Sequence, residues 1–374
     1  MNIKITNGQV FDPETKIISN RDILIKDEFF SDIEGEDSTI IDASGCIVTS
    51  GLIDYHVHFF NRGTENGVNS DAYAFPCGIT TAIDAGSTGA ANYQLYRNTI
   101  MTFSDVRILN ALAVSSGGQI TNSYPENSDP NYFNRDKIKR LFEKYADNLV
   151  GLKIRLSNGI IEKEKAKVSL NETIKLAEEI GTRVIVHMTN PCIDLEYLAE
   201  VLRPGDVFCH CYQGKGDTIL DKNGKLRDVM KKAQERGVLF DSSNGKNNFD
   251  LDVCKKAISY GLKPDIISCD INAENFFVQP LHSLPRIMSK YLDLGMTVEE
   301  VLSTVTINPA KAINREDLAS LRSETVADVV ILKLKDKKVQ YTDVAGHVVN
   351  GDKVFVPQMT IKSGKVMYCQ SDFC

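Results

Sequence analysis

Four of the six histidines stand where short apolar, strand-like segments end, and another such segment ends in a carboxylate. His56 and His58 close one segment, His187 closes a second, His210 lies near the end of a third, and Asp270 ends a fourth. Residues two apart on a strand point to the same face, so His56 and His58 share one. Converging imidazoles and a carboxylate are typical ligands of zinc or a similar first-row ion. The sequence therefore predicts a metal site, with separately hydrogen-bonded core histidines as the alternative.

Lys153 adds a further group with chemical potential, in the stretch VGLKIRLS. An inward-facing lysine normally loses its proton or pairs with a carboxylate, because burial of its charge is costly. An ammonium cannot bind a metal, whereas an amine that adds carbon dioxide becomes a carbamate, an anion able to bridge two cations. The spacing alone does not indicate this modification.

The elements that must position these residues are short strands alternating with amphipathic helices, the pattern of a parallel α/β domain. Eight β-α units in about 250 residues predict a TIM (β/α)8 barrel, in which carboxyl ends of strands converge on the catalytic mouth. A doubly wound sheet is the main rival, but no G-x-G-x-x-G follows the first strand. The expected strands are Leu52–His58, Thr80–Asp84, Arg107–Val114, Val150–Leu156, Arg183–His187, Val207–Cys211, Val238–Asp241 and Asp265–Asp270.

The two ends of the chain resemble each other and differ from the middle. Residues 2–48 and 327–369 both contain short strands broken at turn sequences. We therefore expect a small β-sandwich domain built from residues 1–50 and 321–374, around a hydrolase barrel of residues 51–320.

The candidate ligands together resemble the amidohydrolase superfamily with a binuclear metal centre. That family has His-x-His after strand one, a carboxylated Lys after strand four, His after strands five and six, and Asp after strand eight. Each element has a match here, in order, and the resemblance covers essentially the whole chain. It implies two divalent ions, with zinc favoured, one held by His56, His58 and Asp270. It further implies that His187 and His210 hold the other ion and that a carbamate on Lys153 bridges the two.

Several stretches are similar to the dihydroorotase-like branch of amidohydrolase/deacetylase metallohydrolases, among them GLIDYHVH, GITTAIDAGSTGA, DVFCHCYQGKGDTILD and LPRIMSKYLDLGMTVEEVLSTVTINPAKA. Members of that branch hydrolyse N-acetyl amino acids and O-acetyl hydroxy acids. The resemblance implies attack by a metal-bridging hydroxide on such an amide or ester, with Asp270 as general base and then acid.

Three other functions compete with this one. A cyclic amide hydrolase of the dihydroorotase type would use the same metal hydroxide, so fold and ligands do not separate the two. A mononuclear nucleobase deaminase would not need Lys153. A non-catalytic scaffold of the same fold would show gaps in the ligand set, and none is present.

Four residues are candidates for substrate contacts. Arg155 shares a face with Lys153 and suits a bidentate clamp on a carboxylate, with a salt bridge as the alternative. Tyr212 and His282 lie in loops after strands six and eight, where ordinary loop surface is the alternative. In that branch strand seven commonly continues into Gly-His-Gly, whereas this chain has Asp241-Ser-Ser-Asn244-Gly245. If that histidine binds substrate, Asn244 changes the specificity.

Composition and charge argue against nucleic acid and membranes as partners and leave a small-molecule substrate. The 374 residues carry 43 Lys plus Arg and 50 Asp plus Glu, a formal charge of −7, without the basic runs of a nucleic-acid binder. No apolar run approaches the ~18 residues of a membrane span, and no signal peptide is recognisable. Nine scattered cysteines read as reduced thiols, which indicates the cytoplasm. A homo-oligomer is compatible with the resemblance.

Overall fold

The wall of the barrel is a parallel sheet whose strands follow chain order. The computed structural model describes residues 2–278 and 282–373. Seven of the eight expected strands are present, and each pairs with the next along the chain. They are β8 (Leu52–Val57), β9 (Ile79–Gly89), β10 (Arg107–Ala113), β11 (Leu149–Arg155), β12 (Val184–His187), β13 (Val207–Cys209) and β14 (Leu239–Asp241). The chain thus has the TIM-like (β/α) barrel that the sequence predicts.

The eighth expected strand, Asp265–Asp270, is not a regular strand. Isolated parallel bridges join Ile266 to Asp241 and Ile271 to Val57, so this segment closes the barrel between β14 and β8 through single contacts. Asp270 has a φ of 53°, which is incompatible with an extended strand. The expectation of a strand here is therefore wrong, although the segment occupies the place of one.

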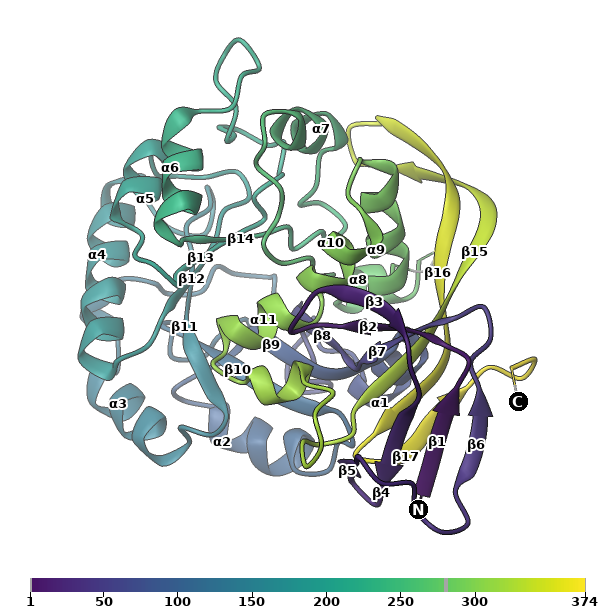
Figure 1. Cartoon of the computed structure of the whole chain (residues 1–374). Helices are drawn as coiled ribbons and strands as arrows, with labels where there is room; N and C mark the ends of the chain where they lie inside the picture. The colour runs from purple at the N-terminus through teal and green to yellow at the C-terminus, as the bar shows by residue number, and fades with distance from the viewer. Residues whose placement is uncertain (1, 279–281, 374) are drawn as a thin grey trace.

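Helices surround this sheet on the outside (Figure 1). In α3 the Asn134 side chain caps the first turn and Ile138, Leu141 and Phe142 are buried, as an amphipathic pattern requires. The α-helices are α1 (Ser70–Ala74), α2 (Tyr93–Tyr96), α3 (Arg135–Lys144), α4 (Lys163–Ile180), α5 (Leu195–Val201), α6 (Asp228–Arg236), α7 (Leu251–Ser259), α8 (Ala273–Phe276), α9 (Leu284–Asp293), α10 (Val298–Thr304) and α11 (Ile307–Ala312). Shorter helical turns are η1 (Phe75–Cys77), η2 (Arg97–Met101), η3 (Pro130–Tyr132) and η4 (Glu316–Ala319).

Strands from both ends of the chain form two further sheets, drawn in purple and yellow in Figure 1. A four-stranded sheet has the order β5-β4-β1-β6, and a six-stranded sheet has the order β17-β16-β15-β7-β2-β3. In the second sheet Ser50 pairs with Val329, so the two ends share one ladder. The strands are β1 (Asn2–Thr6), β2 (Gln9–Asp12), β3 (Ile17–Asn20), β4 (Ile23–Lys26), β5 (Phe29–Phe30), β6 (Thr39–Asp42), β7 (Ile47–Ser50), β15 (Val329–Thr342), β16 (Val348–Lys362) and β17 (Lys365–Cys369).

The long hairpin of β15 and β16 extends beyond this sheet and runs alongside α9 (Figure 1). The backbone N–H of Phe355 donates to Ser289 Oγ at 2.9 Å, and Leu251 at the start of α7 donates to Asp343 beyond the end of β15 at 2.7 Å. These contacts fix the hairpin against the rim of the barrel.

Two properties of the whole chain bear on the sequence expectations. Within the described ranges, none of the helices combines the length and apolar character of a membrane span. Among the described residues, seven cysteines are free and buried, whereas Cys369 is disulfide-bonded, so the expectation of reduced thiols is wrong for that residue.

Candidate metal centre

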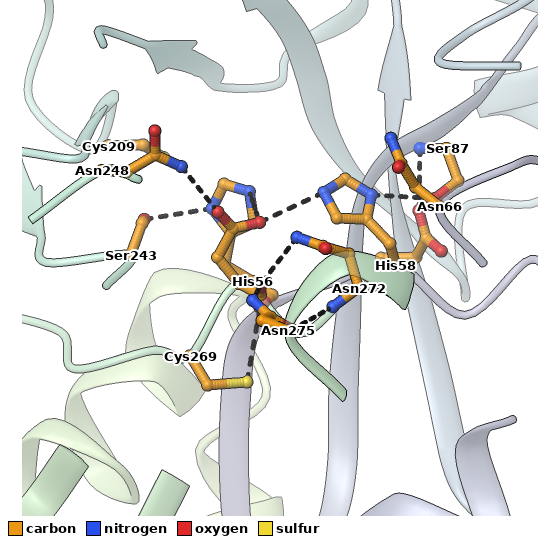
Figure 2. A network of polar contacts seen from close by, with 12 residues as sticks. His56, His58, Asn66, Ser87, Cys209, Ser243, Asn248, Cys269, Asn272 and Asn275 are labelled. Atoms are coloured by element: carbon orange, nitrogen blue, oxygen red, sulfur yellow. Dashed lines mark hydrogen bonds and ion pairs between the residues drawn. The ribbon is translucent and has the colours of Figure 1, made fainter. Parts of the chain in front are cut away.

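His56 and His58 bring two imidazoles to the mouth of the barrel. His56 lies within a register irregularity of β8 between Asp54 and Val57, and His58 follows the end of that strand. Both rings are buried. Their ring centroids lie 5.7 Å apart, and their Nε2 atoms lie 3.7 Å and 3.3 Å from Asp270 Oδ1. The donor atoms of these three residues lie within 4.8 Å of one another, as a shared cation requires. Figure 2 shows both rings and their polar neighbours.

His187 and His210 lie against this group. Their ring centroids are 4.2 Å apart, and the ring of His210 lies 5.1 Å from that of His56. His210 follows the last residue of β13 and has a φ of 56°, a strained conformation that places its ring. Its Nε2 atom is buried and has no hydrogen-bond partner among the described residues.

Lys153 approaches from β11 and is only 2% exposed. Its Nζ lies 3.5 Å from His56 Nε2 and 3.9 Å from Cys209 Sγ. Gly86 of β9 leaves the space for it, since a Cβ there would lie 2.8 Å from Lys153 Cγ. All six predicted metal ligands therefore meet at one end of the barrel.

Hydrogen bonds at the Nδ1 atoms orient three of the rings. His58 Nδ1 pairs with Ser87 Oγ and His56 Nδ1 with Ser243 Oγ, each at 3.0 Å (Figure 2). His210 Nδ1 lies 2.7 Å from the Ser243 carbonyl. Ser243 Oγ in turn donates to Asp241 at 2.5 Å. Such outer contacts leave the Nε2 atoms to face the centre.

Asp270 is held by a second polar chain. Asn248 Nδ2 donates to Asp270 Oδ2 at 2.8 Å, and the Thr189 hydroxyl donates to Asn248 Oδ1 at 2.8 Å. The threonine fixes which way the amide faces, so Asn248 presents N–H to the carboxylate. Oδ2 is engaged in this way while Oδ1 faces the imidazoles.

Electrostatics keep these groups in the protonation states of metal ligands. Burial lowers the pKa of His56 and His187 well below the ordinary value, and it lowers the pKa of His210 to about 3. The imidazoles are therefore neutral and carry free lone pairs. Burial alone would raise the pKa of Asp270, but the neighbouring His56 and further histidines lower it instead, so the carboxylate is ionised.

The donor chemistry fits divalent cations. Buried imidazoles, an ionised carboxylate and the Lys153 side chain converge here, and His210 Nε2 has no hydrogen-bond partner among the described residues. A buried polar atom without a partner is costly, and a bound cation would remove that cost.

A cavity of about 340 Å³ opens above this cluster, and Arg155 lies in its wall with His58, His187 and Asp270. The Arg155 guanidinium lies 3.9 Å from Glu126, beyond hydrogen-bonding distance, and Glu126 Oε2 and Arg155 Nε have no hydrogen-bond partner in the described part of the chain. Of the four predicted substrate contacts, Arg155 is the one in this wall.

The other three predicted contacts lie elsewhere. Tyr212 is a core residue whose hydroxyl donates to the Leu262 carbonyl at 3.0 Å. Asn244 and His282 line a neighbouring cavity, and His282 Nε2 lies 2.6 Å from the Cys269 carbonyl. The structure does not bring these three side chains to the wall of the cavity above the metal cluster.

Sequence reasoning missed the residues that hold the ligands in place, Ser87, Ser243 and Asn248. Serine and asparagine are common in loops, so their types gave no indication. Cys209, adjacent to His210, also faces the cluster, and burial raises its pKa to about 12, so it is a thiol and not a thiolate ligand.

Comparison with known proteins agrees with this geometry. The amidohydrolase family matches residues 47–367. A deacetylase of Agrobacterium fabrum is 30% identical over 326 residues, covering 87% of this chain and 80% of the relative. A dihydroorotase of Streptococcus pyogenes is 31% identical over 196 residues, covering 50% of this chain and 43% of the relative.

Solved structures extend the likeness to the whole fold. The crystal structure of a dihydroorotase has a TM-score of 0.89 at 28% identity, covering 99% of this chain and 98% of that one. The crystal structure of an adenine deaminase has a TM-score of 0.88 at 26% identity, covering 98% and 99%. With a family match over most of its length and histidine and aspartate groups fit for a metal, this chain belongs to the amidohydrolase family and is a hydrolase acting on carbon–nitrogen bonds.

Proposed function

We propose that the protein hydrolyses the amide or ester bond of a small acylated carboxylic acid, an N-acetyl amino acid or an O-acetyl hydroxy acid, using two divalent cations, with zinc favoured. The observation that carries the proposal is the convergence of two imidazole pairs, an ionised carboxylate and a buried lysine at the barrel mouth. The relatives named deacetylase support this reaction class.

His56, His58 and Asp270 would hold one ion, and His187 and His210 the other. A carbamate on Lys153 would join the two sites. When bound, the ions polarise the scissile carbonyl and lower the pKa of a coordinated water.

The residues of the chain supply the proton transfer and the orientation. Water adds to the carbonyl carbon, and Asp270 Oδ1 accepts its proton and returns it to the leaving nitrogen or oxygen as that bond breaks. Asn248 keeps the other carboxylate oxygen engaged, so that Oδ1 is the one presented to the reacting atoms. The Arg155 guanidinium, in the cavity wall, binds the substrate carboxylate.

The test is acetate release from both enantiomers of N-acetyl amino acids and O-acetyl α-hydroxy acids, with zinc- and manganese-loaded protein. We expect release from one enantiomeric series, and Lys153→Ala should abolish it. Arg155→Gln should raise KM for substrates with a free carboxylate and leave KM for their methyl esters unchanged.

Hydrolysis of a ring amide is the second candidate, and the overlap with a dihydroorotase structure favours it. Fully metallated protein that releases no acetate from the whole panel would contradict the deacetylase proposal. Turnover of dihydroorotate, hydantoins or lactams by the same preparation would then establish the second candidate.

A further inference from the structure

A second cavity, of about 270 Å³, lies beside the metal cluster between the turn after β14, helix α9 and the end of β15. Its wall includes Lys246, Arg286 and Lys290. Phe249, Ile287 and Tyr341 provide apolar surface in the same wall, and so the cavity combines positive charge with room for an apolar group.

Lys290 is the buried base of this cavity. Its side chain comes from α9 and is 8% exposed. The ammonium lies 3.3 Å from the ring centroid of Phe249 and donates to Asn244 Oδ1. An ammonium has three donors, and Asn244 is the one acceptor that the described residues offer it.

Arg286 lies one turn earlier on the same helix. Its guanidinium stacks 5.0 Å from the ring centroid of Tyr341 and donates to the Gln340 carbonyl at 2.9 Å. In residues 2–278 and 282–373, no carboxylate forms an ion pair with Arg286, Lys290 or Lys246. Three basic side chains thus border one cavity, and within the described residues none of them is ion-paired with a carboxylate.

Asp343, the acidic side chain in the cavity wall, is already engaged. Its side chain is 1% exposed, and Oδ2 accepts from the Leu251 N–H at 2.7 Å and from His347 Nδ1 at 2.9 Å. These hydrogen bonds keep it out of direct contact with the bases, although its charge still acts on Lys290. One acidic residue against three basic ones leaves the lining of the cavity with an excess of basic groups.

We propose that this cavity is a binding site for a small organic carboxylate, whose oxygens pair with the Lys290 ammonium and the Arg286 guanidinium while its hydrocarbon part packs on Phe249 and Ile287. A carboxylate fits because the guanidinium presents parallel donors to two oxygens. The apolar wall and the small volume favour a monocarboxylate with a short or aromatic substituent over a bulky polyanion.

The carboxylate has two sources that share this chemistry. The turn Asn244–Asn248 separates the cavity from the metal cluster, and Lys246 lines both cavities. Gly245 lines the second cavity and packs against the proposed base, since a Cβ on it would lie 2.5 Å from Asp270 Oδ2. The second cavity and Asp270 are therefore separated by this glycine. The ligand is thus either the carboxylate end of the hydrolysed substrate or a separate acid. The first assignment rests on the proposed function and would place that carboxylate here and not at Arg155.

Calorimetric titration of the full-length, metal-loaded protein with benzoate tests the site without any turnover. Lys290→Met keeps the length of the side chain and removes its charge, and Arg286→Gln keeps a hydrogen-bonding group and removes the guanidinium. We expect each to weaken benzoate binding by about tenfold or more, the effect of losing a charged hydrogen bond. Lys255→Met, at an exposed position of α7, is the matched control and should bind like the wild type.

Benzoate bound at Arg155 or at the metals would respond to none of these substitutions. The proposal would be overturned if the wild type, Lys290→Met and Arg286→Gln bound benzoate with equal affinity. It would also be overturned if the wild type did not bind benzoate. Circular dichroism verifies folding, and Arg286→Gln, on a half-buried residue, remains informative if Lys290→Met does not fold. Crystals soaked with 4-iodobenzoate should show an anomalous peak beside Lys290.

Inhibition kinetics identify the source of the ligand. Benzoate is tested as an inhibitor of whichever N-acetyl amino acid or O-acetyl hydroxy acid proves to be a substrate. Competitive inhibition by benzoate, with a raised KM in Lys290→Met, would assign the cavity to the substrate carboxylate. Non-competitive inhibition would assign it to a separate acid. If no substrate is found, the calorimetry still decides whether the site exists.

Discussion

The two carboxylate oxygens of Asp270 have different neighbours, and this asymmetry underlies its proposed role. Oδ1 faces His56 and His58, whereas Oδ2 accepts from Asn248. The residue itself has a φ of 53°, a strained conformation for aspartate, which the surrounding contacts hold. Strain of this kind is found where geometry matters for chemistry.

Asp270→Asn should retain metal yet lose most turnover. The amide keeps the shape of the side chain and one oxygen for coordination, but it cannot accept and return a proton, which costs about 10²- to 10⁴-fold in rate. Metal content by atomic emission and kcat on the best acyl substrate measure the two properties. A metal-loaded variant with near-normal kcat would exclude Asp270 as the base.

Asn248→Ala should lower kcat about tenfold, the scale of one lost charged hydrogen bond, with little change in KM. The reason is that Asp270 Oδ2 loses its donor while Arg155, the proposed contact of the substrate carboxylate, stays in place. Asn247→Ala is the control, because Asn247 lines the same cavity and no hydrogen bond joins it to Asp270, so this variant should keep the wild-type kcat. An equal effect of both substitutions would indicate general disturbance of the turn and contradict a positioning role.

Lys290 should make stability depend on pH. Burial lowers its pKa from the ordinary 10.5 to about 7, so between these values the unfolded chain binds more protons than the folded one. Above pH 10.5 the lysine is neutral in both states, so burying it does not make stability depend on pH. The loss of folding free energy grows as the pH falls from 10.5 to 7, and it is constant below pH 7. Relative to Lys290→Met, the wild type should therefore gain up to about 1.4 kcal/mol per unit from pH 7 upward. Urea unfolding at pH 7, 8 and 9 measures this, and parallel stabilities would contradict it.

At the scale of elements, the barrel strands place the ligands, and this is the part that the sequence predicted. Parallel strands end at the same rim, so residues at their carboxyl ends had to meet, and His187 on β12 meets His210 just after β13. Seven of the barrel strands could be predicted from apolar runs in the sequence, because a strand buried on both faces is apolar along its whole length.

The turns after the strands could not be predicted in the same way. Ser243 has a φ of 37°, so the alternation of β14 does not continue through it, and Asn244 faces Lys290 instead of the metal cluster. The left-handed conformation of Asp270 likewise breaks the eighth strand, although no glycine marks the position. Turn geometry depends on tertiary contacts that spacing does not encode.

Gly86→Ala tests how β9 accommodates Lys153. An added Cβ would lie 2.8 Å from Lys153 Cγ, and the φ of 94° disfavours any side chain. We expect a loss of about 2 to 4 kcal/mol in the free energy of unfolding together with reduced metal content. Gly159→Ala, with a φ of 86° and open space around it, isolates the backbone cost. Equal losses and full metal content in both variants would show that the contact with Lys153 is unimportant.

At the scale of the whole molecule, the candidate metal centre joins elements that are distant in sequence. Its ligands come from β8 and the residue after it, from β11 and β12, and from the segments that follow β13 and α7. A cation held by all of them would bind the folded state and not the unfolded one. Binding of this type stabilises the fold by mass action.

Metal removal should therefore lower the thermal stability of the protein. Dialysis against a chelator should reduce Tm by several degrees. An ion whose free concentration is 100 to 1,000 times its Kd contributes about 3 to 4 kcal/mol to the free energy of unfolding. Calorimetry before and after chelation, with re-addition of zinc, measures the effect. In His187→Asn the shift should be smaller. An unchanged Tm in protein shown to be metal-free would contradict a stabilising centre.

The ladder between Ser50 of β7 and Val329 of β15 has a consequence for synthesis on the ribosome. In the six-stranded sheet β7 lies between β2 and β15, so its second edge stays open until the entire barrel has been translated. An open strand edge is a template for unwanted pairing, and long-range pairing is slow. Completion of this sheet therefore belongs to the last stage of folding, after the segment that contains the metal ligands has emerged.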